Sequence, residues 1–272
     1  MTEILMILLK VSVVVTIVAV GAGASPADVT WLWRRPMLMV RSLGAMYLLV
    51  PLVAFGLVLA LPIEPGVKAA MLVLAVSSGA PMLPKKLRKL GNQEYIFSLL
   101  VTSSLAAIVA VPFWIAALGA YFQAAVALPP GTVSIAVAKA ILLPLAIGMA
   151  LHALFPLWSE RLAERMIAIA GLVLAISGFM LLIVNWQLVS DMSWPAILAL
   201  VALMICALTF GELLGGPARD DRTSLAIACA TRHVGVAVVV AGEFVGIKTS
   251  VMIIAYFLTV IVVSSIYLTW RR

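Results

Sequence analysis

The feature that most constrains this chain is a series of continuous apolar runs that follow one another along nearly all of its 272 residues. Each run is about 18–25 residues long, the length that a helix needs to cross the hydrocarbon core of a bilayer. Because lipid offers no hydrogen-bond partners to the backbone, such runs must form helices or closed barrels. A barrel would need alternating polar and apolar residues instead. The pattern therefore predicts an all-α polytopic membrane protein.

The composition supports a membrane protein and argues against several other classes. Hydrophobic residues make up 65% of the chain and charged residues 11%, against about 45–50% and about 25% in soluble domains. The net charge of +7 fits basic cytoplasmic loops, so we expect membrane lipid as a partner and no nucleic acid. The sequence has no HExxH or GxSxG motif, and Cys206 and Cys229 lack metal-site spacing. We expect no enzyme activity, no metal and no cofactor.

The apolar runs predict nine membrane spans joined by short connections, which leaves room for one membrane domain over residues 1–272 and no separate soluble domain. The predicted spans are 4–23, 38–61, 67–83, 95–119, 132–154, 165–186, 194–214, 223–240 and 250–270.

The basic residues predict how these spans are oriented. Alternate connections hold most of the lysines and arginines, and the connections between them hold only Lys68 and Lys248. Because basic loops stay in the cytoplasm, we expect the N-terminus outside and the C-terminus in the cytoplasm of a bacterial inner membrane. The residues on the predicted cytoplasmic side are Arg34, Arg35, Arg41, Lys85, Lys86, Arg88, Lys89, Arg161, Arg165, Arg219, Arg222, Arg271 and Arg272.

The third predicted span contains residues that interrupt a helix. Ser77, Ser78 and Gly79 are followed by Pro81 and Pro84, and each proline removes a backbone donor and blocks the preceding turn. We expect the helix to open here and to restart as a short basic half-helix. The alternative is that the helix simply ends near Ser78 and a basic loop follows.

The eighth predicted span has its weak point at Thr231 to Gly235, around Arg232 and His233. An arginine at the middle of a membrane helix costs about 2.5–3.5 kcal/mol, so it normally faces protein or a water-filled cavity. Arg232 therefore either serves function or caps the carbonyls of a broken helix. His233 is a candidate ligand or proton carrier, or else an ordinary hydrogen-bonded interior residue.

The positions of these two interruptions predict an internal repeat. Broken helices at corresponding places in two halves of a chain mark the binding site of many secondary transporters. If one helix is missing at the N-terminus, both interrupted spans are the fourth of a five-helix repeat, and an odd repeat is inserted upside down. We predict a first repeat over 1–122, a second over 123–272, and two broken helices that cross at mid-bilayer.

Three stretches resemble the bile acid:sodium symporter family, within the bile acid/arsenite/riboflavin transporter superfamily. They are "WLWRRPMLMVRSLGAMYLLVPLVAFGLVLAL", "GAPMLPKKLRKLGNQEYIFSLLVTSSLAAIVAVPF" and "RTSLAIACATRHVGVAVVVA". The resemblance implies a nine-span form of this fold, in which a panel domain and a core domain rock against each other. On that mapping, predicted spans one, five and six form the panel and the others form the core.

The chain departs from the sodium-coupled members where they bind ions. Those members carry Glu-x-Gly-x-Gln-Asn in the second crossover helix, and the alignment places Ala228 at the glutamate, Arg232 at the glutamine and His233 at the asparagine. In the first crossover, Lys85 falls near the usual Ser-Asn. A hard cation needs oxygen ligands, so loss of the carboxylate and gain of a cation should abolish the sodium site.

Other candidate site residues follow from the same mapping. Ser98 and Thr102 keep the i, i+4 hydroxyl pair that the family's next helix offers to an ion, and Ser77 stands where the arsenite branch uses a thiolate. Glu212, well inside the seventh span, is a candidate proton carrier or ion-pair partner of Arg232.

These observations predict a secondary transporter that moves a small organic anion by alternating access, without sodium, with Arg232 standing in for a bound cation. The substrate- or ion-binding residues that we expect are Arg232, His233, Thr231, Ser77, Ser78, Lys85, Ser98 and Thr102. A proton or an exchanged anion would then supply coupling. The alternatives are a sodium-coupled organic anion symporter and a non-transporting membrane receptor on the same fold.

Overall fold

The computed structural model describes residues 2–23, 30–77, 91–122, 130–232, 237 and 247–271. Within these ranges the chain forms helices and no strands. The elements in chain order are α1 (Thr2–Ala22), η1 (Leu32–Arg34), α3 (Pro36–Gly44), η2 (Ala45–Leu49), α4 (Val50–Ala60), α5 (Pro65–Val76), α7 (Gln93–Tyr121), α8 (Pro130–Leu154), α9 (Pro156–Val184), α10 (Trp186–Ser190), α11 (Trp194–Leu214), α12 (Arg219–Ala230) and α14 (Ile247–Arg271).

Each of the nine predicted spans contains a described helix. Six described helices are long and apolar enough to cross a membrane, and α3, η2 and α4 together count as one of them. The protein is therefore an integral membrane protein. The remaining predicted spans contain α5, α12 and α14, and the count of nine crossings stays a prediction.

Prolines and short polar residues set where several helices begin. Pro36, Pro65 and Pro156 stand first in α3, α5 and α9, where the missing N–H would have no helical partner and the fixed φ favours the first turn. Asn92 caps α7 by accepting a hydrogen bond from the backbone N–H of Tyr95 at 3.1 Å. The connections between helices thus carry their own start signals.

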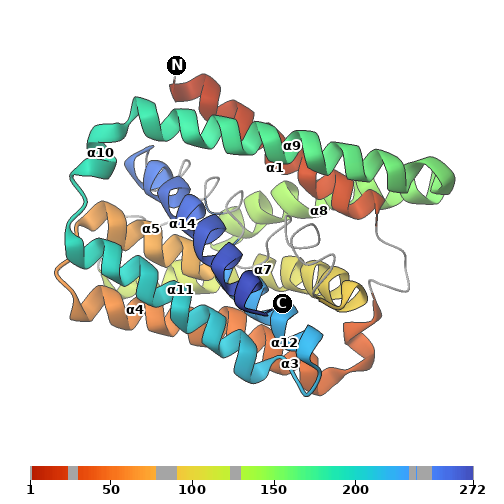
Figure 1. Ribbon diagram of the computed structural model, residues 1–272, viewed down its shortest axis with the longest axis horizontal. Helices are drawn as coiled ribbons and strands as arrows, with labels where there is room; N and C mark the ends of the chain where they lie inside the picture. The colour runs from red at the N-terminus through yellow and green to blue at the C-terminus, as the bar shows by residue number, and fades with distance from the viewer. Residues whose placement is uncertain are drawn as a thin grey trace.

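The helices fall into two groups with α7 and α14 between them. In Figure 1, α1, α8 and α9 lie together along one side, and α1 packs closely against both of its partners. On the other side, α4, α5, α11 and α12 pack against one another. Helix α7 contacts α8, and α14 contacts both α5 and α9. The largest buried apolar cluster is centred on the second group and extends onto α7, α8 and α14.

Glycine allows the tightest of these contacts. A Cβ on Gly148 of α8 would lie 2.1 Å from the Val18 carbonyl oxygen of α1, and one on Gly21 would lie 2.5 Å from the Leu145 oxygen. Small residues let the backbones of membrane helices approach in this way. The α1–α8 contact therefore requires glycine on both helices.

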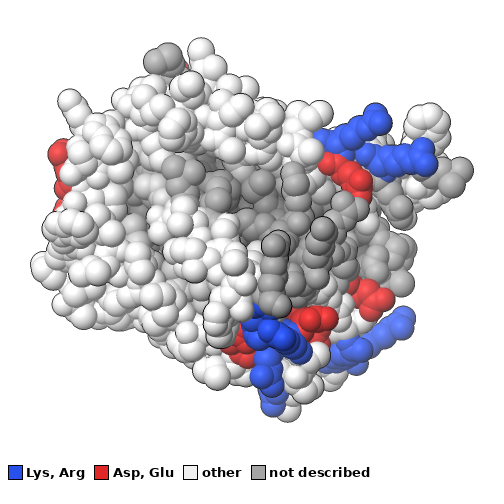
Figure 2. Space-filling model, in the orientation of Figure 1, with Lys and Arg blue, Asp and Glu red and all other residues white. Residues whose placement is uncertain are grey.

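On the face shown in Figure 2, the charged side chains gather in a few places. Figure 2 shows lysine and arginine in two groups at one end of the molecule, over the ends of α3, α12 and α14 and over the ends of α8 and α9, and a broad uncharged surface extends from there to acidic side chains at the opposite edge. The same ends carry acidic side chains. An uncharged band between charged ends is what a lipid-embedded protein presents.

Candidate functional site

Two short helices end inside the second group. Helices α5 and α12 have 12 residues each, so each is about 18 Å long and reaches little more than half of the hydrocarbon core. Ser77 is the C-cap of α5 and Thr231 is the C-cap of α12, so both helices end next to the interruptions that the sequence predicts. The continuations after these helices, with Ser78, Lys85 and His233, lie outside the described residues.

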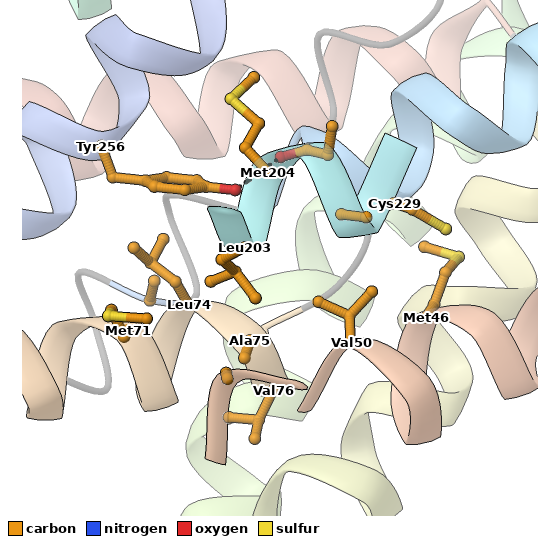
Figure 3. Close-up of a cluster of buried hydrophobic side chains, with 14 of the residues drawn as sticks. Met46, Val50, Met71, Leu74, Ala75, Val76, Leu203, Met204, Cys229 and Tyr256 are labelled. Carbon is orange, nitrogen blue, oxygen red and sulfur yellow. Dashed lines mark hydrogen bonds between the residues drawn. The ribbon is translucent and has the colours of Figure 1, made fainter. Parts of the chain in front are cut away.

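The ends of α5 and α12 are buried together with residues of η2, α11 and α14. Figure 3 shows Val76 from α5, Cys229 from α12, Met46 from η2 and Tyr256 from α14 in one cluster. The Tyr256 hydroxyl donates a hydrogen bond to the Ala230 carbonyl oxygen at 3.0 Å. One carbonyl at the buried end of α12 thus receives its hydrogen bond from a neighbouring helix.

Thr231 closes α12 through its own hydrogen bonds. Its N–H and its hydroxyl both donate to the Ile227 carbonyl oxygen, at 2.8 and 2.6 Å. The side chain is buried. Thr231 therefore terminates the helix and places Arg232, the next residue, directly beyond the negative end of the helix dipole.

Arg232 is buried, with 3% of its surface exposed. Its Nη1 donates to the Met46 carbonyl oxygen of η2 at 3.1 Å, whereas Nη2 is buried without a hydrogen-bond partner among the described residues. The titratable side chains that interact with it are Cys229, Tyr256 and Tyr47, none of them a carboxylic acid. Arg232 therefore presents a cation that no described acid neutralises.

The Met46 carbonyl is free to accept because of a π-helical turn and a proline. In η2 the N–H of Val50 bonds to Ala45, five residues back, so the donor for Met46 in the same register would be residue 51. That residue is Pro51, which has no N–H. The guanidinium of Arg232 supplies the missing donor, and π-helical turns of this kind are frequent at functional sites.

The neighbouring carbonyl is satisfied by another helix. Pro51 also leaves Tyr47 without a donor four residues later, and the indole Nε1 of Trp114 in α7 donates to the Tyr47 oxygen at 2.7 Å. The Tyr47 hydroxyl donates to the Ser103 carbonyl oxygen. These contacts with α7 fix η2, and with it the position of Arg232. Pro51, which lies within the second apolar run, was the sequence signal that carbonyls before it would need donors from elsewhere.

Ser77 is the second buried group without a partner at this site. Its side chain has no exposed surface, and its Oγ has no hydrogen-bond partner among the described residues. Its N–H bonds to Val73 and Leu74 at 3.1 Å, which ends α5. A buried hydroxyl without a partner is costly unless a ligand, a water or a further part of the chain completes it.

The predicted hydroxyl pair on α7 contacts the chain between α1 and α3. Ser98 Oγ accepts a hydrogen bond from the backbone N–H of Leu32 at 2.8 Å. Thr102 Oγ1 accepts one from the indole Nε1 of Trp33 at 3.0 Å. Both hydroxyls thus anchor η1 to α7, a role that the sequence analysis did not anticipate.

Glu212 pairs at the far end of α14 and not with Arg232. Its carboxylate accepts hydrogen bonds from Arg271 and from the hydroxyl of Tyr267. The ion pair is partly exposed, with side-chain exposures of 14% for Arg271 and 23% for Glu212. No cluster of three or more His, Cys, Asp or Glu residues at metal spacing is found in the described ranges.

The family comparison agrees with this architecture. A search of curated proteins gives no match. The model of the sodium bile acid symporter family matches residues 10–192, which span α1 to α10 and therefore include η2 and the end of α5. The match stops before α12 and Arg232. Because it covers more than half of the chain, the protein belongs to the sodium bile acid symporter family, whose members are membrane transporters and not enzymes.

Proposed function

We propose that this chain is a secondary transporter of a small organic anion, that it works by alternating access, and that it is not coupled to sodium. The observation that carries the proposal is the buried Arg232, with Nη1 held by Met46 and Nη2 without a described partner. A guanidinium with one bonded and one available amino group is a fixed donor for a carboxylate or a sulfonate.

The helix dipoles support a fixed cation at this place. Helices α5 and α12 both direct their carbonyl ends into the buried cluster, and each end carries a partial charge of about −0.5. Carbonyl ends of broken helices coordinate cations in many secondary transporters. Arg232 supplies a positive charge at such an end without any ion, and a second cation a few ångströms away would be repelled.

Ser77 completes the proposed site from the other half of the chain. Its Oγ and Arg232 Nη2 are both buried donors without described partners, and they follow the ends of the two 12-residue helices. An anion between them would accept from both. We place Ser78, Lys85 and His233 in the same region as further candidates, with a proton or an exchanged anion as the coupling species.

The two helix groups supply a basis for alternating access. We propose that α1, α8 and α9 act as a panel and that the group containing α5 and α12 acts as the core. The surfaces between them include small apolar clusters, one of which joins Leu9, Leu181 and Ile254. Apolar packing of this kind can be exchanged for another arrangement without breaking ion pairs. The N-terminus would lie outside and the C-terminus in the cytoplasm.

The test begins with binding. Purified protein is unfolded thermally in sodium chloride and in choline chloride, each with and without acetate, pyruvate, benzoate and methanesulfonate. A ligand at 100 times its Kd adds about 2.7 kcal/mol, which such an assay detects. We expect anion stabilisation in choline, loss of that stabilisation in Arg232→Gln, and its retention in Lys139→Gln, a matched change at an exposed basic residue of α8. Stabilisation that requires sodium would support the symporter alternative.

Flux then separates a transporter from a receptor. The anion that gives the largest stabilisation is offered to proteoliposomes in choline buffer. Uptake that Arg232→Gln abolishes supports the proposal, whereas binding without uptake supports the receptor alternative. The variant Arg232→Gln with Ala228→Glu restores a carboxylate and removes the cation, and we expect it to respond to sodium where the native chain does not.

A further inference from the structure

A second site is formed by a cavity at the charged end of the molecule, away from Arg232. It has a volume of about 760 Å³ and opens between the start of α3, the start of α7 and the turn before α12. Charged side chains cluster over these helix ends (Figure 2). The charged and polar residues that line the cavity are Arg35, Arg41, Asn92, Asp220 and Asp221.

Among the described residues, no ion pair joins the arginines and aspartates that line this cavity, although Arg35 and Asp221 are near enough to attract each other electrostatically. Arg35 stacks on Trp31, with its guanidinium carbon 3.6 Å from the ring centre, and Asp221 accepts a hydrogen bond from the Asn92 amide at 3.0 Å. Arg41 and Asp220 are exposed, and neither forms an ion pair within the described ranges. The cavity therefore has arginines on its α3 side and aspartates on its α12 side, with space between them.

Such a cavity is complementary to a ligand with an anionic and a cationic group a short distance apart. We propose that it binds the headgroup of a zwitterionic phospholipid with a primary ammonium group, as in phosphatidylethanolamine. Arg41 and Arg35 contact the phosphate, because guanidinium groups bind phosphate oxygens in pairs. Asp220 accepts hydrogen bonds from the ammonium group, while Asp221 is held by Asn92.

The surface next to the cavity favours a lipid over a soluble zwitterion. Met37 lines the cavity and begins a stripe of exposed apolar residues that continues through Val40, Leu48 and Leu52. Gly44 lies within this stripe, and a Cβ there would meet nothing within 4 Å. An acyl chain can follow the stripe along the lipid-facing side of the helix, with its headgroup at the membrane–water boundary.

The experiment is native mass spectrometry of the purified full chain with dioleoylphosphatidylethanolamine, dioleoylphosphatidylglycerol and soluble glycerophosphoethanolamine. We expect one phosphatidylethanolamine to be retained at least about five-fold more tightly than phosphatidylglycerol, and Arg41→Gln to weaken both lipids about five-fold. Asp220→Asn should remove the preference for the ammonium headgroup without weakening phosphatidylglycerol. Arg161→Gln, an exposed arginine of α9, should change nothing. Thermal unfolding of each variant verifies its fold, and the replaced side chains are all exposed.

Two results would overturn the proposal. If Asp220→Asn leaves the ratio of the two lipid affinities unchanged, the cavity does not recognise the ammonium group. If glycerophosphoethanolamine binds as tightly as the lipid, the acyl chain contributes nothing and the ligand is a soluble zwitterion. Neither result bears on anion transport at Arg232, because the two sites share no residue.

Discussion

The replacement Arg232→Met tests whether the buried arginine serves the ligand or the fold. Methionine keeps much of the length of the side chain and removes both the charge and the donor to Met46. An unsatisfied buried carbonyl costs about 1–3 kcal/mol. Arg232 is buried without a described acid, and its removal recovers a desolvation cost that we take from the insertion penalty of arginine at mid-membrane, about 2.5–3.5 kcal/mol. The net change lies between a loss of about 0.5 and a gain of about 2.5 kcal/mol.

The assay is thermal unfolding of the detergent-purified protein, together with anion-dependent stabilisation. We expect Tm to be unchanged or raised, by about 2–4 °C for each kcal/mol gained, while the response to anions is lost. A fall in Tm of more than about 5 °C would refute the reasoning, because the arginine would then be a structural cap that the fold requires.

The ion pair between Arg271 and Glu212 supplies the matched control. Arg271→Met also removes an arginine, but one that hydrogen-bonds to a partly exposed carboxylate. Loss of a hydrogen bond to a charged group costs about 1.5–3 kcal/mol, which partial exposure reduces. We expect this variant to be less stable and to keep its anion response, the opposite of Arg232→Met on both measurements.

Further predictions concern packing, anchoring and pH. Gly148→Ala should destabilise the protein by about 1–3 kcal/mol, because its Cβ would overlap a backbone carbonyl of α1. Gly119→Ala, with open space around it, should be neutral or stabilising. Equal Tm values for the two variants would show that α1 and α8 can move apart without a loss of stability. Ser98→Ala should lower stability by about 1–3 kcal/mol by leaving a buried N–H of η1 unpaired, and an unchanged urea midpoint would contradict this. Burial raises the pKa of Asp221 above its ordinary 3.8, although the hydrogen bond from the Asn92 amide acts in the opposite direction. The contribution of Asp221 to stability is therefore present at low pH and is lost as the pH rises through the raised pKa. Asp221→Asn should remove this part of the pH dependence of Tm. Burial alone would raise the pKa of Glu64, but hydrogen bonds from backbone and side-chain donors lower it below 4.5. The contribution of Glu64 to stability is therefore present above that pH and is lost on acidification. Glu64→Gln should weaken the fall of Tm at acidic pH, and an unchanged dependence of Tm on acidic pH would argue against this role.

Much of the fold could be predicted because the bilayer imposes a simple rule on sequence. The apolar runs located a helix in each predicted range, although α9 begins at Pro156, well before the predicted start at residue 165. The weak points near Ser77 and Thr231 coincide with the ends of α5 and α12. Local signals sufficed in these cases, because helix ends depend on residues within one turn.

The contacts of the site depended on residues far apart in the chain and could not be predicted. Nothing near Arg232 indicates that its partner is the carbonyl of Met46, 186 residues away. Glu212 was a reasonable candidate partner as a carboxylate inside a core span, but Arg271, 59 residues along the chain, contacts it instead. Pro51 indicates that nearby carbonyls need another donor, but only the packed structure shows that Arg232 supplies it.

The bond between Arg232 and Met46 has a mechanical consequence. It fastens the end of α12 to the π-helical turn η2, and Trp114 fastens the same turn to α7. These hydrogen bonds join three segments from distant parts of the chain, so we expect the three segments to move together. The proposed rocking motion would then occur along other surfaces, such as the apolar contact between α9 and α14. If the protein transports by the proposed rocking motion, we expect Arg232 to keep its position relative to η2 and α7 throughout the cycle.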